Sequence, residues 1–193
     1  MKLIAITGSI GSGKSVVAKI VETLGFPVYD CDTRAKALME SQPSVRDALS
    51  AMFGPEVYTF QGLNRTWLAE RIFSDTKARN YVNRIVHQAV KDDIRHWAQT
   101  LGQTHRALFV ETAIPTTSGI AAMVDEVWKV DTPVHIRRER VVTHRKMSAE
   151  DFNNRDNTQT AETANLPGVV INNSGTESLL AQIIGLIQSL GDE

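Results

Sequence analysis

The sequence predicts an α/β protein built around a parallel sheet with helices on both of its faces. Two observations support this fold class. Short apolar segments alternate with longer segments whose apolar residues recur at helical spacing. The apolar segments contain few polar residues, as expected of strands that are buried on both faces. Because parallel strands need crossover connections, usually through helices, the alternation favours a parallel sheet.

The composition is that of an ordinary folded protein and excludes several classes. Of the 193 residues, 42% are hydrophobic and 22% are charged, which excludes a disordered chain. The net charge of −1 gives no overall attraction to nucleic acid or acidic membranes, so we expect neither as a partner. A single cysteine, Cys31, excludes an internal disulfide and fits a reducing compartment. No segment resembles a signal peptide or a membrane span, so we expect a cytoplasmic protein. We expect it to be a monomer or a small homo-oligomer.

Residues 1–30 predict a strand, a glycine-rich loop, a helix and a second strand. The apolar run at residues 3–6 is the first strand. Apolar residues at helical spacing over residues 15–24 stop at Gly25, where the helix should end. Residues 27–29 are the second strand, so this part of the chain is a βαβ unit.

Between the second and third strands the chain is mainly helical. This block covers residues 33–104, and its longest helical pattern spans residues 75–101. Three further strands are predicted after it, at residues 107–110, 126–130 and 168–171. The sheet therefore has five strands, and the helical block is an insertion into it.

Two other segments lie around the last strand. A basic stretch at residues 135–146 is followed by a polar segment at residues 153–165, and an amphipathic helix is predicted at residues 177–190. A run of charges is most often the solvated face of a helix, so the basic stretch does not by itself indicate a site.

The glycine-rich loop after the first strand matches the phosphate-binding pattern G-x-x-x-x-G-K-[ST]. The candidate ATP-binding residues of this loop are Gly8, Ser9, Ile10, Gly11, Ser12, Gly13, Lys14 and Ser15. Its glycines allow successive N–H groups to face phosphate oxygens at the positive end of the following helix. Lys14 should reach the β- and γ-phosphates, and the Ser15 hydroxyl should hold magnesium. The dinucleotide-binding pattern G-x-G-x-x-G is excluded because Val16 stands where it needs glycine.

Two aspartates, Asp30 and Asp32, follow the second strand. In open parallel sheets, ligands bind at the carboxyl ends of the strands, so a carboxylate here could orient or deprotonate an acceptor hydroxyl. Asp32 could equally be the N-cap of the helix expected to begin near Thr33. Position alone leaves these two roles open.

The phosphate loop together with V-Y-D-C-D-T-R-A-K at residues 28–36 resembles the dephospho-coenzyme A kinases, the family that completes coenzyme A biosynthesis. The likeness continues along nearly the whole chain. Further matching segments are R-I-F at residues 71–73, V-N-R-I-V-H at 82–87, V-E-T-A-I at 110–114, S-A-E-D-F at 148–152 with Arg155 and Gln159, and V-I-N-N-S-G at 170–175.

This resemblance implies a P-loop NTPase core with a five-stranded parallel sheet, a helical insert that binds the acceptor, and a helical lid. The nucleotide-binding core would comprise residues 1–32, 105–133 and 166–193. The acceptor-binding domain would be residues 33–104, and the mobile lid residues 134–165.

The resemblance also implies a reaction, in which the γ-phosphate of ATP, bound with Mg²⁺, passes to the ribose 3′-hydroxyl of dephospho-coenzyme A. The implied site residues are Asp32, Lys14, Arg140 and Arg145 for catalysis, Asp32 and His87 for the acceptor, Asn173 near the nucleotide base, and Ser15 for the metal. In the basic stretch, Arg140 and Arg145 would act on phosphate and the other residues would be solvated surface. His87 is equally well explained as a half-buried helix residue.

Four positions depart from the family pattern. Gln88 replaces a proline, Thr117 an acidic residue, His144 a lid arginine, and Asn165 an aspartate. These departures concern the acceptor side and the lid and leave the phosphate loop intact. Another P-loop nucleoside or nucleotide kinase, and a degenerate paralogue that only binds nucleotide, are therefore the alternatives. A switch GTPase is disfavoured by the lack of an N-K-x-D motif.

Overall fold

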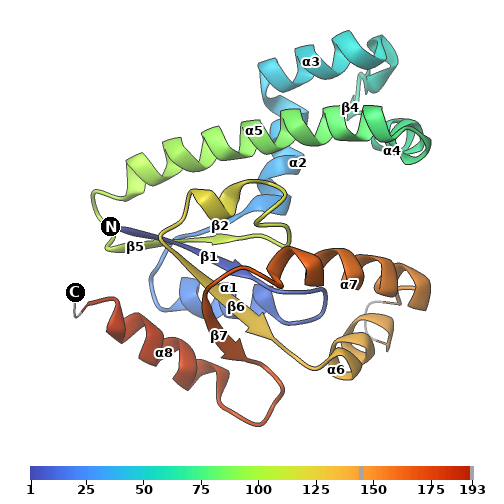
Figure 1. Cartoon of the computed structure of the whole chain (residues 1–193). Helices are drawn as coiled ribbons and strands as arrows, with labels where there is room; N and C mark the ends of the chain where they lie inside the picture. The colour runs from blue at the N-terminus through green and yellow to red at the C-terminus, as the bar shows by residue number, and fades with distance from the viewer. Residues whose placement is uncertain (144–145, 192–193) are drawn as a thin grey trace. The chain divides into compact units, whose positions relative to one another are not determined.

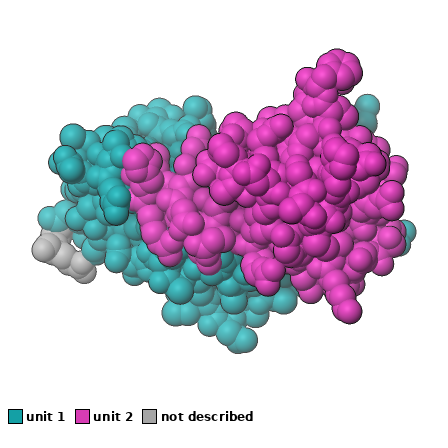
Figure 2. All heavy atoms as spheres, turned by 90° about the horizontal axis from the view of Figure 1, so that it is seen from above, with its two compact units in different colours: residues 1–30, 98–193 teal, residues 31–97 magenta. Residues whose placement is uncertain are grey.

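The computed structural model describes residues 1–143 and 146–191 and divides into two compact units, which Figure 2 colours separately. The first unit is Met1–Asp30 with Ala98–Glu193, and the second is Cys31–Trp97. Within the described residues, no helix is both long and apolar enough to cross a membrane.

The first unit contains a five-stranded parallel sheet, so the predicted fold class is confirmed. Its strands are β1 (Lys2–Thr7), β2 (Val28–Asp30), β5 (Ala107–Glu111), β6 (Glu126–Asp131) and β7 (Val169–Asn172). They are arranged in the order β2-β5-β1-β6-β7, with every pair parallel. The predicted strands match these segments to within two residues at each end.

The core of this unit lies between the sheet and two helices, α1 (Lys14–Thr23) and α8 (Leu179–Ser189), which lie on the same face of the sheet (Figure 1). Phe109 and Trp128 are fully buried there, with ring centroids 4.9 Å apart in an edge-to-face arrangement. The first four residues of β5 are all buried, so both faces of the sheet are covered, as parallel sheets require.

A second, smaller apolar cluster anchors the glycine-rich loop. Three segments follow β6: α6 (Val134–Arg138), a π-helical turn (Glu139–Thr143) and α7 (Ala149–Thr163). Buried Val141 and Phe152 from these segments pack with Ile10 of the loop. Most of the polar segment predicted at residues 153–165 belongs to the helix α7. The buried residues of this helix are Phe152 and Glu162.

The second unit is mainly helical, as the sequence predicts. Its helices are α2 (Cys31–Ser41), α3 (Pro43–Phe53), the 3₁₀ turn η1 (Pro55–Val57), α4 (Arg65–Ser74) and α5 (Thr76–Leu101), the last of which ends in the first unit. The sequence did not predict the antiparallel hairpin of β3 (Tyr58–Thr59) and β4 (Gly62–Leu63). Two-residue strands are too short to show an alternating pattern. The division into core, acceptor-binding domain and lid stays a prediction.

Candidate active site

The glycine-rich loop joins β1 to α1 at the carboxyl end of the sheet. Gly13 caps α1 in a left-handed conformation with φ of 100°, and the amides of Val16 and Val17 donate to its carbonyl at 2.9 and 3.1 Å. A side chain at this position would be strained and would collide with the Asn173 amide nitrogen. The loop therefore has the conformation for which its glycines are needed.

Lys14, the first residue of α1, folds back over the loop. Its Nζ donates to the carbonyls of Gly8 at 2.8 Å and Ser9 at 3.4 Å. The ammonium group is thus held at the mouth of a loop that follows a buried strand and opens a helix. A lysine held there places a positive charge where such loops bind the β- and γ-phosphates.

The hydroxyl of Ser15 donates to Oε1 of Glu111 at 2.8 Å. Glu111 is the last residue of β5 and is paired in register with Ile6 of β1, so a carboxylate lies beside the predicted metal-binding hydroxyl. Oxygen atoms of a hydroxyl and a carboxylate are ligands that Mg²⁺ prefers, so this pair fits the ion. Glu111 was not among the predicted site residues, although an acid that ends a strand neighbouring the phosphate loop is a detectable pattern.

Magnesium in phosphotransferases keeps several water molecules and is held partly by substrate phosphates, so few protein ligands are needed. Residues 1–143 and 146–191 contain no cluster of three or more His, Cys, Asp or Glu side chains that could hold a metal ion.

The strands β6 and β7 bring two further residues to the loop. The Asn173 side-chain amide donates to the Ser12 carbonyl at 2.7 Å, and its backbone N–H donates to the Asp131 carbonyl at 2.8 Å. The hydroxyl of buried Thr132 also donates to the Ser12 carbonyl, at 3.0 Å. Asn173 was among the predicted site residues and does lie against the phosphate loop. Thr132 was not predicted.

Arg140, the predicted lid arginine, lies in the π-helical turn and contacts the same region. Its two terminal nitrogens donate to the carbonyls of Gly11 at 3.3 Å and Asn173 at 3.0 Å. The guanidinium group is therefore at the loop. Arg145 and His144, the other lid positions considered, lie outside the described residues.

The interpretation of Arg137 as solvated surface was wrong. Its side chain is 10% exposed, and its Nε donates to the Thr132 carbonyl at 2.8 Å. Nη1 donates to the Ile10 carbonyl at 3.3 Å and to the carboxylate of Asp156. A charge run does not reveal such burial, because the partners are backbone carbonyls and a carboxylate far away in the sequence. Arg138, next to it, is exposed as expected.

The loop after β5 contains the Thr117 departure, and a carboxylate binds there from another element. Oε2 of Glu162 in α7 accepts from the backbone N–H groups of Thr116 and Thr117, each at 2.9 Å. The Thr117 hydroxyl also donates to Glu162. An acidic group therefore occupies this loop although residue 117 is not itself acidic. Among the other departures, Asn165 is exposed just beyond α7, and Gln88 is exposed on α5.

The predicted acceptor residues, Asp32 and His87, belong to the second unit. Asp32 is exposed in the first turn of α2, which begins at Cys31, so Asp32 lies inside the helix and not at its N-cap. Arg34, one half-turn further on, donates through Nε and Nη2 to Asp93 of α5 at 2.7–2.9 Å, which ties the start of α2 to α5. His87 is half-buried on α5.

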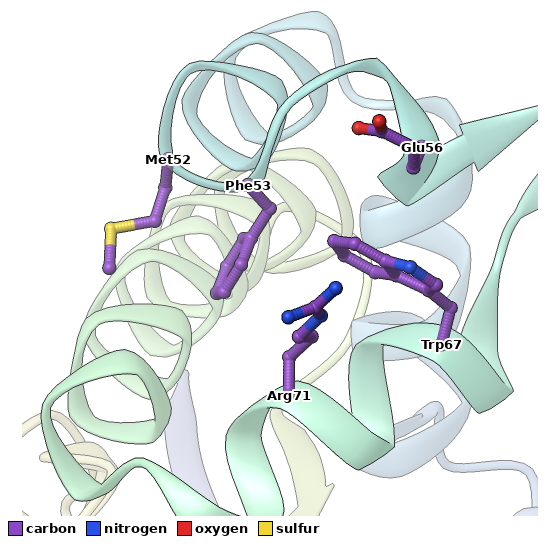
Figure 3. A pocket seen from close by; sticks show the side chains of 5 residues that line it. All are labelled: Met52, Phe53, Glu56, Trp67 and Arg71. Carbon is purple, nitrogen blue, oxygen red and sulfur yellow. The ribbon is translucent and has the colours of Figure 1, made fainter.

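The second unit also contains a pocket of about 410 Å³, shown in Figure 3. Its lining residues are Met52, Phe53, Glu56, Trp67 and Arg71. The Phe53 and Trp67 rings are nearly perpendicular, with an interplanar angle of 88° and centroids 6.3 Å apart. The guanidinium carbon of Arg71 lies 4.8 Å from the Trp67 centroid, on the side toward Phe53 (Figure 3). The walls are thus aromatic and apolar, with one cationic and one anionic group.

Comparison with known proteins agrees with this geometry. The family model for dephospho-CoA kinase matches residues 2–178. A dephospho-CoA kinase from Porphyromonas gingivalis is 38% identical over 194 residues, covering 98% of this chain and 95% of the relative. A second relative, the dephospho-CoA kinase of Corynebacterium diphtheriae, is 33% identical and covers 95% of this chain and 94% of its own length.

Two solved structures share the fold. TT1252 from Thermus thermophilus has a TM-score of 0.81 at 25% identity, covering 97% of this chain and 96% of its own. A dephospho-CoA kinase from Campylobacter jejuni has a TM-score of 0.71 at 21% identity, covering 99% and 98%. From the family match and the identity over nearly the whole chain, this protein belongs to the dephospho-CoA kinase family and is an ATP-dependent kinase.

Proposed function

We propose that the chain transfers the γ-phosphate of ATP to the ribose 3′-hydroxyl of dephospho-coenzyme A, the last step of coenzyme A biosynthesis. The observation that carries this proposal is the phosphate loop, with Lys14 and Ser15 in place, in a chain that matches the dephospho-CoA kinase model over residues 2–178. The departures at Thr117 and Gln88 leave this loop intact.

On the ATP side, the loop amides and Lys14 would bind the phosphates, and Asn173 would lie near the base. Ser15 and Glu111 would hold Mg²⁺, which neutralises charge on the transferring phosphate when bound. Arg140 would add a positive charge over the phosphates, once its guanidinium exchanges the loop carbonyls for phosphate oxygens. Arg145 remains a candidate for the same role.

On the acceptor side, Asp32 would orient the 3′-hydroxyl and accept its proton. The hydroxyl oxygen forms the new bond to the γ-phosphorus, the bond between that phosphorus and the bridging oxygen breaks, and ADP leaves. Asp32 is exposed in the first turn of α2, so its carboxylate is accessible to a substrate. His87 and the pocket beside Trp67 are candidates for acceptor contacts within residues 33–104.

The first experiment is to incubate the purified protein with magnesium-ATP and dephospho-coenzyme A and to detect the phosphorylated product by mass spectrometry. Adenosine, cytidine and nucleoside monophosphates serve as competing acceptors. Product from dephospho-coenzyme A alone supports the proposal. Product from a nucleoside or nucleotide instead, or ATP binding without any product, would overturn it in favour of the two alternative functions.

Two variants test the residue roles. Lys14→Ala should abolish transfer, whereas Asp32→Asn should keep ATP affinity and lower kcat by about a hundredfold, the contribution of a positioned base. Asp47→Asn, an exposed aspartate on α3, is the matched control and should be fully active. Normal turnover by Asp32→Asn would contradict the role of this carboxylate but not the activity itself.

A further inference from the structure

The carboxylate of Glu162, near the C-terminal end of α7, is bound by the loop after β5. The residue is 8% exposed, and its Oε2 accepts two consecutive backbone N–H groups, from Thr116 and Thr117, at 2.9 Å each. The Thr117 hydroxyl donates to the other carboxylate oxygen, and the Thr116 hydroxyl donates to the Glu162 backbone carbonyl at 2.8 Å. Successive amides that converge on one oxygen form an anion-binding nest. Here the anion is a side chain from α7.

The same helix contacts the phosphate loop directly. Thr160, two residues before Glu162, shares a hydrogen bond of 3.0 Å with the Ser9 hydroxyl. One turn earlier, Asp156 pairs with Arg137, which donates to the Ile10 carbonyl. One helix therefore binds two loops: the phosphate loop through Thr160 and Asp156, and the loop after β5 through Glu162.

These two loops flank the hydrogen bond between Ser15 and Glu111. Ser15 ends the phosphate-binding pattern, and Glu111 ends β5 just before the loop that binds Glu162. A shift of α7 would therefore change both sides of the proposed Mg²⁺-ATP site at once.

Apolar packing does little to hold the C-terminal half of α7. Phe152, its only buried apolar residue among those described, lies in the first turn, and Glu162 is the other buried residue. Charge-assisted hydrogen bonds to a buried carboxylate are among the strongest polar contacts in proteins, so Glu162 is the group that can fix this end.

We propose that Glu162 is a positioning residue of the ATP site, which locks the C-terminal end of α7 to the loop after β5 and so sets the phosphate loop. This inference rests on the proposed function for its kinetic consequence only. Its central expectation, an effect on nucleotide affinity, is independent of the acceptor.

The variant Glu162→Gln tests the charge with little change in volume. A glutamine can keep its carbonyl oxygen against the two backbone amides and donate its NH₂ group to the Thr117 hydroxyl oxygen. The variant therefore removes the charge and turns three charge-assisted hydrogen bonds into weaker neutral ones. We expect the dissociation constant for magnesium-ATP, measured by calorimetry, to rise about tenfold, as for loss of a hydrogen-bonded buried charge. The Michaelis constant for ATP should rise similarly, while that for dephospho-coenzyme A stays within about twofold, because the acceptor residues lie in other elements. Glu22→Gln, an exposed acid at the far end of α1, is the charge-matched control and should behave as the unmodified protein.

Two further measurements keep the proposal testable if Glu162→Gln does not fold. In the unmodified protein, the amide protons of Thr116 and Thr117 should exchange slowly with deuterium, since both are bound to Glu162. Thr117→Val, which removes one hydroxyl donor and keeps both amides, should raise the ATP dissociation constant by about threefold. Fast exchange of both amides, or a Glu162→Gln protein with unchanged ATP affinity, would overturn the proposal. A protein that binds ATP as expected and loses affinity in Glu162→Gln, yet does not phosphorylate dephospho-coenzyme A, would refute the proposed function and leave the role of Glu162 standing.

Discussion

The buried pair of Arg137 and Asp156 allows a quantitative test of how the phosphate loop is supported. Their side chains are 10% and 15% exposed. Removal of one partner from a buried ion pair leaves an uncompensated charge and costs about 3–5 kcal/mol. In Asp156→Ala, Arg137 keeps the Thr132 and Ile10 carbonyls as acceptors, so we expect a loss near the lower limit, about 3 kcal/mol of unfolding free energy.

In Arg137→Met the loss should be larger, about 4 kcal/mol, because Asp156 loses its cation and two carbonyls lose a donor. The double variant should lose about 2 kcal/mol less than the sum of the single changes, since the second change removes a charge that the first left unpaired.

Urea denaturation, monitored by fluorescence and circular dichroism, measures these changes in the free energy of unfolding. The exposed pair Arg95 and Asp92, whose side chains are 54% and 59% exposed, is the control. Asp92→Ala should change stability by less than about 0.5 kcal/mol. Additive losses from Arg137→Met and Asp156→Ala, within about 0.5 kcal/mol, would refute the reasoning, because a buried pair must show coupling.

Other expectations concern the loop backbone and pH. Gly11→Ala should weaken ATP binding, because φ there is 78° and the added Cβ would lie 2.6 Å from the Arg137 carbonyl oxygen. Calorimetry measures the ATP affinity of this variant. Gly185→Ala in α8, where the added Cβ meets open space, is the control and should bind ATP normally. The pKa of Tyr58 is raised above 10.0, mainly by burial, with Arg46 acting against the rise. Since the unfolded tyrosine then ionises first, the contribution of Tyr58 to stability should be complete below pH about 10 and lost as pH rises through the folded pKa. Phenolate absorbance and denaturation at rising pH detect this loss, and Tyr58→Phe should not show it.

Much of the first unit could be predicted from the sequence, because its main features are local. A continuous apolar run gives a strand that is buried on both faces, and the spacing of glycine, lysine and serine in residues 8–15 specifies a loop whose conformation few other residues can adopt. The five strands and the helix after the loop followed from these two patterns. Asn173 could be predicted only from the resemblance to the dephospho-coenzyme A kinases, since nothing in its own segment indicates that it contacts Ser12.

The parts that could not be predicted depend on polar contacts between distant segments. The burial of Arg137 depends on backbone carbonyls at Ile10 and Thr132, which have no sequence pattern. The contact of Glu162 with Thr116 and Thr117 spans 45 residues and more. Because α7 has almost no apolar stripe, its helical periodicity is weak, and the sequence predicts only a polar segment there.

The position of β1 at the centre of the sheet has a consequence for how the chain folds. Its first partner in register, Ala107, is 105 residues later in the chain, and its other neighbour, β6, begins at Glu126. During synthesis, β1 therefore cannot pair until more than half of the protein has been made. The helices of Cys31–Trp97 can form earlier, from contacts within that unit. An apolar strand that stays unpaired for so long is prone to aggregation until β5 arrives. The helical insertion is thus expected to fold first, and closure of the sheet around β1 is the slow step.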